Sequence, residues 1–285
     1  MSNHHVFSVP PTTSEYQYQG RKHFTNTLHY EYHRFLNNDI PEPKSQFIIF
    51  SHLNKQSFLD DFANSNDIQF SHSYNSYIYP LGLLLVKLTT EADEEAHGVL
   101  DKLIISKLTL MDNRQLDLHS LRKAAKTSNS RSQRPDTAYR PVDLPAGRSD
   151  KWPSTVIETG YSEGKSKLAE DARWWLTESR GDVKNVLTVS VHQTKKEIVI
   201  ESWGWSGRPT RAESARRVPE VKQRVVITQS INQPVAHVAG APLTIPFEDL
   251  FLRQPVPSSR EGELVFDVQE LKYMAYMIWQ VCGNV

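Results

Sequence analysis

Residues 155–191, TVIETGYSEGKSKLAEDARWWLTESRGDVKNVLTVSV, carry the most regular apolar pattern of the sequence. The stretch begins with the β-rich run 155–160, continues with apolar residues three and four positions apart, and ends with the apolar run 183–191. Runs of β-branched residues are typical of strands, and the spacing in the middle is typical of an amphipathic helix. Gly181 is the kind of residue that ends a helix. The pattern therefore predicts a strand, a helix over 163–179 and a second strand.

The neighbouring segments extend this pattern in both directions. Residues 197–203, EIVIESW, follow the turn-sized HQTKK and predict a hairpin with the preceding strand. Thr90 and Asp93 suit an N-terminal cap, and the apolar residues after them predict a helix over 91–110. The other predicted elements are strands at 46–50, 76–88, 224–231 and 243–247, a short helix at 57–65 and a final helix at 267–281.

The composition limits the class of protein. The 285 residues contain 33 Lys and Arg, 33 Asp and Glu, and the single cysteine Cys282. One cysteine excludes an internal disulfide and a cysteine-rich zinc site, which favours an intracellular location, cytoplasmic or nuclear. The first twenty residues lack the pattern of a signal peptide, and no segment has the roughly 20 apolar residues that cross a bilayer. We therefore expect a globular protein with no membrane partner.

The segment 120–151 differs from its surroundings. It contains eight Lys or Arg and three Asp, with Ser, Asn, Pro and Gly throughout. This composition predicts a flexible basic loop that connects a hairpin, and a surface that contacts phosphates is the alternative.

Two acidic residues stand out as candidates for chemistry. Glu158 lies inside an apolar strand, where a carboxylate is costly to bury unless it is paired or bound to a cation. Asp136 follows Pro135, and either ordinary turn chemistry or a ligand role explains it.

These pieces together resemble the PD-(D/E)xK nuclease superfamily, in particular its restriction-endonuclease branch and related fungal domains. The resemblance lies in RPDTAYRP, STVIETGYSE, KSKLAEDARWWL and VKNVLTVSV, more weakly in APLTIPFEDLF, and covers about residues 90–252. It implies an α/β (α+β) fold with a restriction-endonuclease-like αβββαβ core, in which helices flank a mixed central sheet.

The resemblance also implies a metal site. Asp136 and Glu158 would bind Mg²⁺ or Mn²⁺, because hard oxygen ligands hold these ions and the bound ion activates a water for attack on a phosphate. The family places a lysine at the position of Gly160, so the lysine must come from the following helix. Lys165 is in phase with the buried face of that helix and is the expected catalytic lysine, whereas Lys167 is expected to be solvated.

Three further acids stay open as metal ligands. Asp150 is a substitute for Asp136, although it lies farther from the family pattern. Members of the family often add an acid from the first helix of the core, and either Glu94 or Glu95 would fill that role.

The composition and the resemblance together predict a domain organisation. Residues 1–20 are polar with no periodic apolar face, which predicts a flexible arm, and an N-terminal extension at 21–89, packed on the core, would precede the nuclease-like domain at 90–252. A linker and a C-terminal helix would follow at 253–285. The apolar face of this helix is expected to pack on the body of the domain, and a homodimer through the extension or the helix is the alternative.

Two hypotheses for the function follow. In the first, the protein is a metal-dependent nuclease that cleaves DNA or RNA with Asp136, Glu158 and Lys165. In the second, the same fold has a degraded site and binds protein or nucleic acid. Gly160 favours the second hypothesis, and the two acids with a lysine in phase favour the first.

Overall fold

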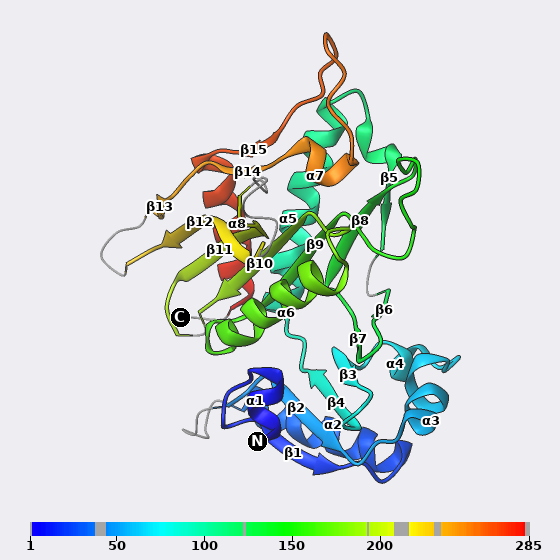
Figure 1. Cartoon of the computed structure of the whole chain (residues 1–285). Helices are drawn as coiled ribbons and strands as arrows, with labels where there is room; N and C mark the ends of the chain where they lie inside the picture. Colours follow the sequence, from blue (N-terminus) through cyan, green and yellow to red (C-terminus); the bar gives the residue numbers. More distant parts are fainter. Residues whose placement is uncertain are drawn as a thin grey trace. The chain divides into compact units, whose positions relative to one another are not determined.

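The computed structural model describes residues 2–37, 44–121, 124–192, 194–207, 217–230 and 235–282. The chain divides into two compact units (Figure 1), of which unit 1 comprises residues 1–89 and 123–134 and unit 2 comprises residues 90–122 and 135–285. Within the described ranges, no helix combines the length and the apolar character that a membrane span requires.

Unit 1 is built on a mixed sheet. Its elements are α1 (Asn3–Phe7), β1 (Ser14–Gln17), α2 (Arg21–Leu36), β2 (Phe47–Ser51), α3 (Lys55–Phe58), the π-helical turn η1 (Leu59–Ala63), α4 (Ile68–Ser71), β3 (Ser76–Ile78), β4 (Leu83–Lys87), β6 (Lys126–Thr127) and β7 (Arg131–Gln133). The strand order among the described residues is β1-β2-β4-β3-β7-β6. β1 and β2 run parallel, and the other neighbours run antiparallel. The predicted strand at 46–50 and the short helix at 57–65 are confirmed in outline, whereas the predicted strand at 76–88 is a hairpin of the two strands β3 and β4.

The core of unit 1 is aromatic. The ring of Phe24 on α2 lies 4.9 Å from the ring of Phe50 on β2 and 5.0 Å from that of Phe62, measured between centroids. Phe58 stacks on Tyr77 with a centroid distance of 3.9 Å. Aromatic side chains bury large areas, so these few contacts account for much of the apolar core of a small unit.

The structure differs from the prediction of a mobile arm at 1–20. Residues 3–17 contain α1 and β1, and Phe7 is fully buried against the apolar residues of β2 and β4. Val6, Phe7 and Val9 are a few apolar residues without a regular period in a polar segment, so the sequence pattern gives no sign that a sheet face is available to bury them.

Unit 2 contains the larger sheet. Its elements are α5 (Glu91–Leu110), the 3₁₀ turn η2 (Arg114–Asp117), β5 (Leu118–Ser120), β8 (Thr137–Pro141), β9 (Thr155–Tyr161), the 3₁₀ turn η3 (Ser162–Gly164), α6 (Lys165–Glu178), β10 (Asn185–Val191), β11 (Glu197–Trp205), β12 (Pro219–Thr228), β13 (His237–Ala239), β14 (Leu243–Ile245), α7 (Phe247–Phe251), β15 (Leu264–Phe266) and α8 (Val268–Val281). In the described part of unit 2, the strand order is β13-β12-β11-β10-β9-β8-β5, and β14 pairs with β15 separately.

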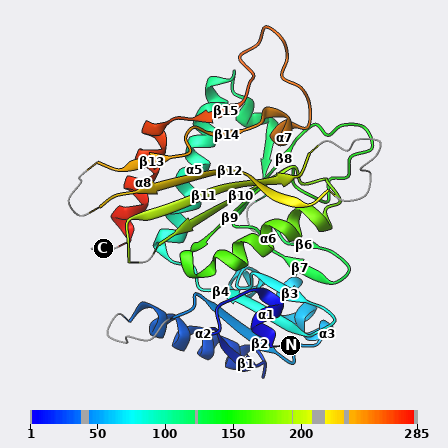
Figure 2. The ribbon, with the colours of Figure 1, turned by 60° about the vertical axis from the view of Figure 1, so that its left-hand side comes forward.

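The predicted fold class is confirmed for unit 2. The order α5–β5–β8–β9–α6–β10 is the expected αβββαβ order, and β9 runs parallel to β10 while β8, β11 and β12 run antiparallel to their neighbours. Ile157 of β9 packs in the cluster that contains α5 and α8, whereas Val156 packs in the cluster that contains α6. Helices therefore cover both faces of the sheet, α6 on one face and α5 with α8 on the other (Figure 2).

The C-terminal helix packs as expected. The apolar side chains on one face of α8 are buried in the same cluster as those of α5, namely Leu271, Met274, Ala275 and Ile278. The opposite face carries Tyr273 and Tyr276, which are more than half exposed. The apolar face of this helix is thus used within unit 2.

The segment 120–151 corrects a prediction. Instead of one flexible loop it contains β6, β7 and β8, which have two to five residues each. β6 and β7 pair with each other within the segment, whereas β7 also pairs with β3 and β8 pairs with β9, which lie elsewhere in the chain. Short strands are stabilised by the sheet they join, so polar composition alone hides them.

Candidate functional site

The site is built on the ladder between β8 and β9. Ala138 of β8 lies opposite Val156 of β9, and both side chains belong to the cluster under α6. Because side chains alternate between the faces of a strand, Glu158, two residues after Val156, falls on that same face. Asp136 directly precedes β8 and lies beside Thr159, the residue after Glu158, whose side chain lies on the opposite face.

Glu158 is a buried carboxylate with a fixed orientation. Only 2% of the residue is exposed, and the indole N–H of Trp175 donates to its Oε1 at 2.6 Å. Trp175 is fully buried on α6. A carboxylate in such surroundings is costly unless donors or a cation compensate for the lost water. The indole supplies one of these donors.

Asp136 is half-buried and is hydrogen-bonded to Thr159. Its Oδ2 accepts two hydrogen bonds from Thr159, one from the backbone N–H and one from the hydroxyl, both at 2.8 Å. Thr159 directly follows Glu158 on β9. These bonds orient the Asp136 carboxylate at the edge where β8 begins.

Lys167 corrects the expectation that it is solvated. The residue is fully buried at the first turn of α6, and its ammonium group contacts the carboxylate of Asp171 and lies 3.3 Å from Oε2 of Glu170. Lys167, Asp171 and Trp175 follow one another at intervals of four, so they share one flank of the helix. The apolar residues alone underestimate how much of α6 is buried, since Asp171 allows a lysine to be enclosed. The spacing of four between Lys167 and Asp171 was the available signal.

Lys165 lies on the other flank of α6. On an ideal helix, two residues are separated by about 200°, so Lys165 points away from the flank that carries Lys167. Lys165 is exposed and borders a hollow over β10, β11 and β12. Its predicted role in catalysis stays a prediction.

Glu94 and Glu95, the two candidate metal ligands on α5, have different neighbours. Glu94 on α5 contacts Nε2 of His97 at 3.0 Å, and Nδ1 of that ring lies 3.4 Å from the hydroxyl of Thr137, the residue after Asp136. Glu95 instead lies 3.9 Å from Nζ of Lys102, measured from its Oε1. The ring of His97 therefore links Glu94 to the start of β8.

Asp150 is the least suited of the candidates. Its side chain is 81% exposed, and its Oδ2 lies 3.8 Å from Nη1 of Arg140. An exposed, loosely paired carboxylate has no need of a metal to offset burial.

Similarity to known proteins is found among solved structures. No protein-family model matches the sequence, and no curated protein matches it. Among solved structures, the chain is similar to a putative nuclease belonging to DUF820 from Anabaena variabilis ATCC 29413, with 12% sequence identity and a TM-score of 0.36. The match covers 70% of this chain and 90% of that chain. A likeness at this level is too low to carry an argument about activity.

Asp136 and Glu158 offer carboxylate oxygens, the type of ligand that a divalent cation such as Mg²⁺ binds. Mg²⁺ prefers carboxylate and water oxygens and is often held by one or two protein carboxylates. Within the described residues, no group of three or more His, Cys, Asp or Glu side chains is arranged to hold a metal. The metal-binding role of Asp136 and Glu158 therefore stays a prediction.

Proposed function

We propose that unit 2 is a metal-dependent nuclease-like domain that hydrolyses phosphodiester bonds of nucleic acid. The observation that supports the proposal is that Asp136, directly before β8, is hydrogen-bonded to Thr159, the residue after Glu158 on β9, and that Glu158 is buried beneath α6. A divalent cation bound by both carboxylates would offset their mutual repulsion. The αβββαβ order of the unit supports the same proposal.

The candidate site residues have distinct roles in the proposed reaction. A Mg²⁺ or Mn²⁺ ion, when bound, would polarise the scissile phosphate and lower the pKa of an attacking water. Asp136 and Glu158 would hold that ion, and the donors from Thr159 and Trp175 would keep the two carboxylates oriented. Lys165 would contact a phosphate from the first turn of α6.

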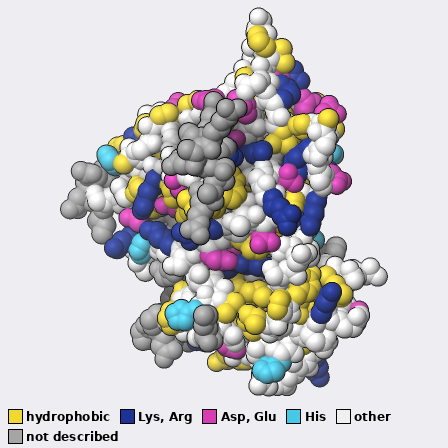
Figure 3. Space-filling view, viewed as in Figure 1, with side chains coloured by type: hydrophobic (Ala, Val, Ile, Leu, Met, Phe, Trp, Pro, Cys, Tyr) yellow, Lys and Arg dark blue, Asp and Glu magenta, His cyan; other side chains and the backbone are white. Residues whose placement is uncertain are grey.

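The surface is compatible with a polyanionic substrate. On the face seen in Figure 3, Lys and Arg side chains of unit 2 are interspersed with Asp and Glu side chains. Local cations position a phosphate backbone, and the formal net charge of zero favours contact at defined points over nonspecific coating.

A binding module is the second candidate function. Gly160 stands where the resemblance expects the lysine, and both acids accept hydrogen bonds from neighbouring side chains. A fold that has lost its catalytic lysine can retain such a polar cluster for structural reasons. It would then bind protein or nucleic acid without cleaving it.

Cleavage assays separate the two candidates. Single- and double-stranded DNA and RNA are incubated with the protein and Mg²⁺ or Mn²⁺, and wild type is compared with Asp136→Asn and Glu158→Gln. The glutamine at 158 keeps an acceptor for the Trp175 indole while removing the charge. The matched control is Glu220→Gln, because Glu220 lies on β12 and its side chain is 47% exposed.

The nuclease proposal expects the two site variants to lose more activity than the roughly 10–100-fold that changes around a metal's ligands cost. The control should keep its activity, and Mn²⁺ should raise the melting temperature of wild type but not of either site variant. If wild type cleaves no substrate and Mn²⁺ leaves its melting temperature unchanged, the nuclease proposal is wrong and the binding module takes its place.

A further inference from the structure

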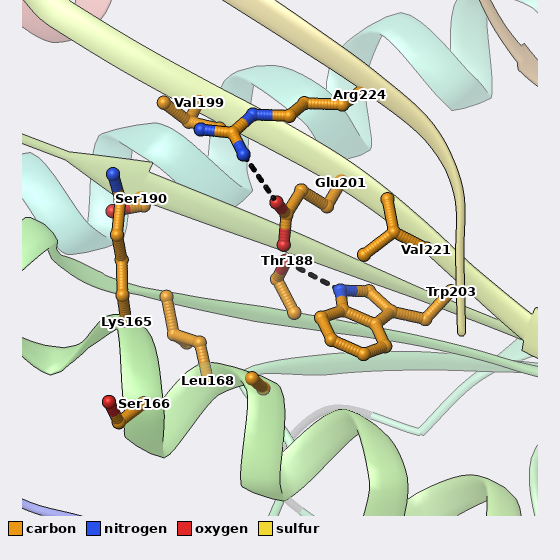
Figure 4. Close-up of a pocket in the computed structure, with 11 residues that line it drawn as sticks. Lys165, Ser166, Leu168, Thr188, Ser190, Val199, Glu201, Trp203, Val221 and Arg224 are labelled. Atoms are coloured by element: carbon orange, nitrogen blue, oxygen red, sulfur yellow. Dashed lines mark hydrogen bonds and ion pairs between the residues drawn. The ribbon is translucent and has the colours of Figure 1, made fainter. Parts of the chain in front are cut away.

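A hollow of about 290 Å³ lies between the first turn of α6 and the strands β10, β11 and β12. Figure 4 shows side chains from the helix and from the three strands facing this space. Its polar members are Lys165, Ser166, Thr188, Ser190, Glu201 and Arg224, and its apolar wall includes Val199 and Trp203. The hollow lies on the flank of α6 opposite to Lys167.

Ser190 has an unsatisfied hydroxyl in this hollow. The residue is only 6% exposed, and within the described part of the chain its Oγ has no hydrogen-bond partner. A buried hydroxyl without a partner is unfavourable, and most such groups in folded proteins are satisfied by protein, water or ligand. A ligand acceptor in the hollow would satisfy this hydroxyl.

Thr188 offers a second hydroxyl donor. Its Oγ1 accepts a hydrogen bond from the indole N–H of Trp203 at 3.3 Å. The oxygen is therefore used as an acceptor, and the hydroxyl hydrogen can donate to another group. Thr188 and Ser190 are two apart on β10, so their side chains lie on the same face of the sheet.

The charge of the lining is positive. Lys165 and Arg224 contribute two cations, and Glu201 contributes one carboxylate. Nη1 of Arg224 lies 3.6 Å from Oε1 of Glu201, a loose ion pair that leaves donors of the guanidinium for other partners. The side chain of Arg224 is 54% exposed and can turn into the hollow.

The helix adds to this potential. α6 has 14 residues and begins at Lys165, directly after the 3₁₀ turn η3, in which the backbone N–H of Lys165 donates to the carbonyl oxygen of Ser162. The positive end of the helix macrodipole thus lies beside the two cations. Hydroxyl donors, cations and a helix N-terminus in one place are the features that recognise a tetrahedral oxyanion.

We propose that this hollow binds a phosphate group, with Ser190 and Thr188 donating from the sheet and Lys165 and Arg224 supplying the charge. The volume is at the small end of ligand pockets, which span about 300–1,000 Å³, so it suits a single phosphate ester with its sugar. The assignment of that ester to the backbone of a nucleic acid rests on the proposed function. The phosphate site itself does not.

Binding measured without divalent metal tests the site. A fluorescein-labelled single-stranded DNA 12-mer is titrated in EDTA, and inorganic phosphate and a nucleoside monophosphate serve as competitors. The variants are Lys165→Gln, Arg224→Gln and Ser190→Ala, and the matched control is Lys222→Gln, which removes one exposed cation from the same strand as Arg224.

Each of the two charge variants should weaken binding of the 12-mer about 10-fold, as expected for a lost charge-assisted hydrogen bond. Ser190→Ala should weaken binding severalfold while its melting temperature without ligand is unchanged or higher, because an unsatisfied hydroxyl is removed. A purely structural role for Ser190 would lower that melting temperature. The control should bind as wild type does.

The outcomes distinguish the phosphate sources and the two proposals. Binding of the nucleoside monophosphate, measured directly by calorimetry in EDTA, without binding of the 12-mer assigns the site to a small phosphate ester. Equal affinity of wild type and all three variants for every probe overturns the site. Because the assay contains no metal, loss of the nuclease proposal through the Asp136 and Glu158 variants leaves these results unaffected.

Discussion

The hydrogen bond between Trp175 and Glu158 can be measured as a coupling energy. The indole N–H lies 2.6 Å from Oε1, and both residues are buried. A hydrogen bond to a charged group stabilises a protein by about 1.5–3 kcal/mol, and burial places this bond within that range. Trp175→Phe removes the donor, and Glu158→Met removes the acceptor while keeping an unbranched side chain of similar length.

The assay is urea unfolding of wild type, the two single variants and the double variant at pH 7. Circular dichroism is the appropriate signal, since one variant changes the tryptophan content. Trp175→Phe should lower the free energy of unfolding by about 2 kcal/mol less in the Glu158→Met variant than in wild type. Contacts that the two side chains make elsewhere cancel in the cycle. Additivity of the two variants within about 0.5 kcal/mol would refute the bond and the orientation of Glu158 derived from it.

Two further predictions concern stability. The bidentate hydrogen bonds from Arg253 at 2.7 Å hold the pKa of Glu261 at about 2, below its value of 4.5 in a free chain, so the stabilisation is present above about pH 4.5 and lost as the pH falls through 2. Melting curves from pH 6 to pH 2 should therefore show a smaller loss for Glu261→Gln, whose deficit at pH 6 is about 1–2 kcal/mol because water screens the half-exposed arginine. Gly240→Ala should destabilise the protein by more than about 2 kcal/mol, because a Cβ would lie 2.1 Å from the backbone oxygen of Arg224 at a φ of +80°. Gly147→Ala is the control, since its φ is +78° but nothing lies within 4 Å of the added atom, and an equal loss for the two variants would contradict the steric argument.

Local patterns predicted the long elements of unit 2 well. The helix at 91–110 begins and ends as expected, and Thr90 and Asp93 form the reciprocal hydrogen bonds of a capping box. The strand at 155–160 and the hairpin formed by β10 and β11 also agree with their apolar runs. In each case the information needed is contained in a few consecutive residues.

The candidate site was less predictable because it depends on partners distant in sequence. The charge of Lys167 suggests solvent, and only its pairing with Asp171 under the packed helix permits burial. The apolar pattern correctly identifies the buried centre of the helix, but it does not distinguish the two flanks. It therefore predicts a buried Lys165 and a solvated Lys167, whereas Lys165 is exposed and Lys167 is buried. The pairing of Glu158 with Trp175 likewise requires the helix to lie over β9.

The discontinuity of unit 1 restricts how the chain can be divided. The segment 123–134 supplies β6 and β7, and β7 is hydrogen-bonded to β3, which comes from the part of the chain before Thr90. A truncated protein that starts at Thr90 would retain these two strands but lack their partner, and an unpaired strand edge promotes association between chains. Expression of unit 2 alone therefore calls for replacing 123–134 with a short polar connection, rather than for a single cut.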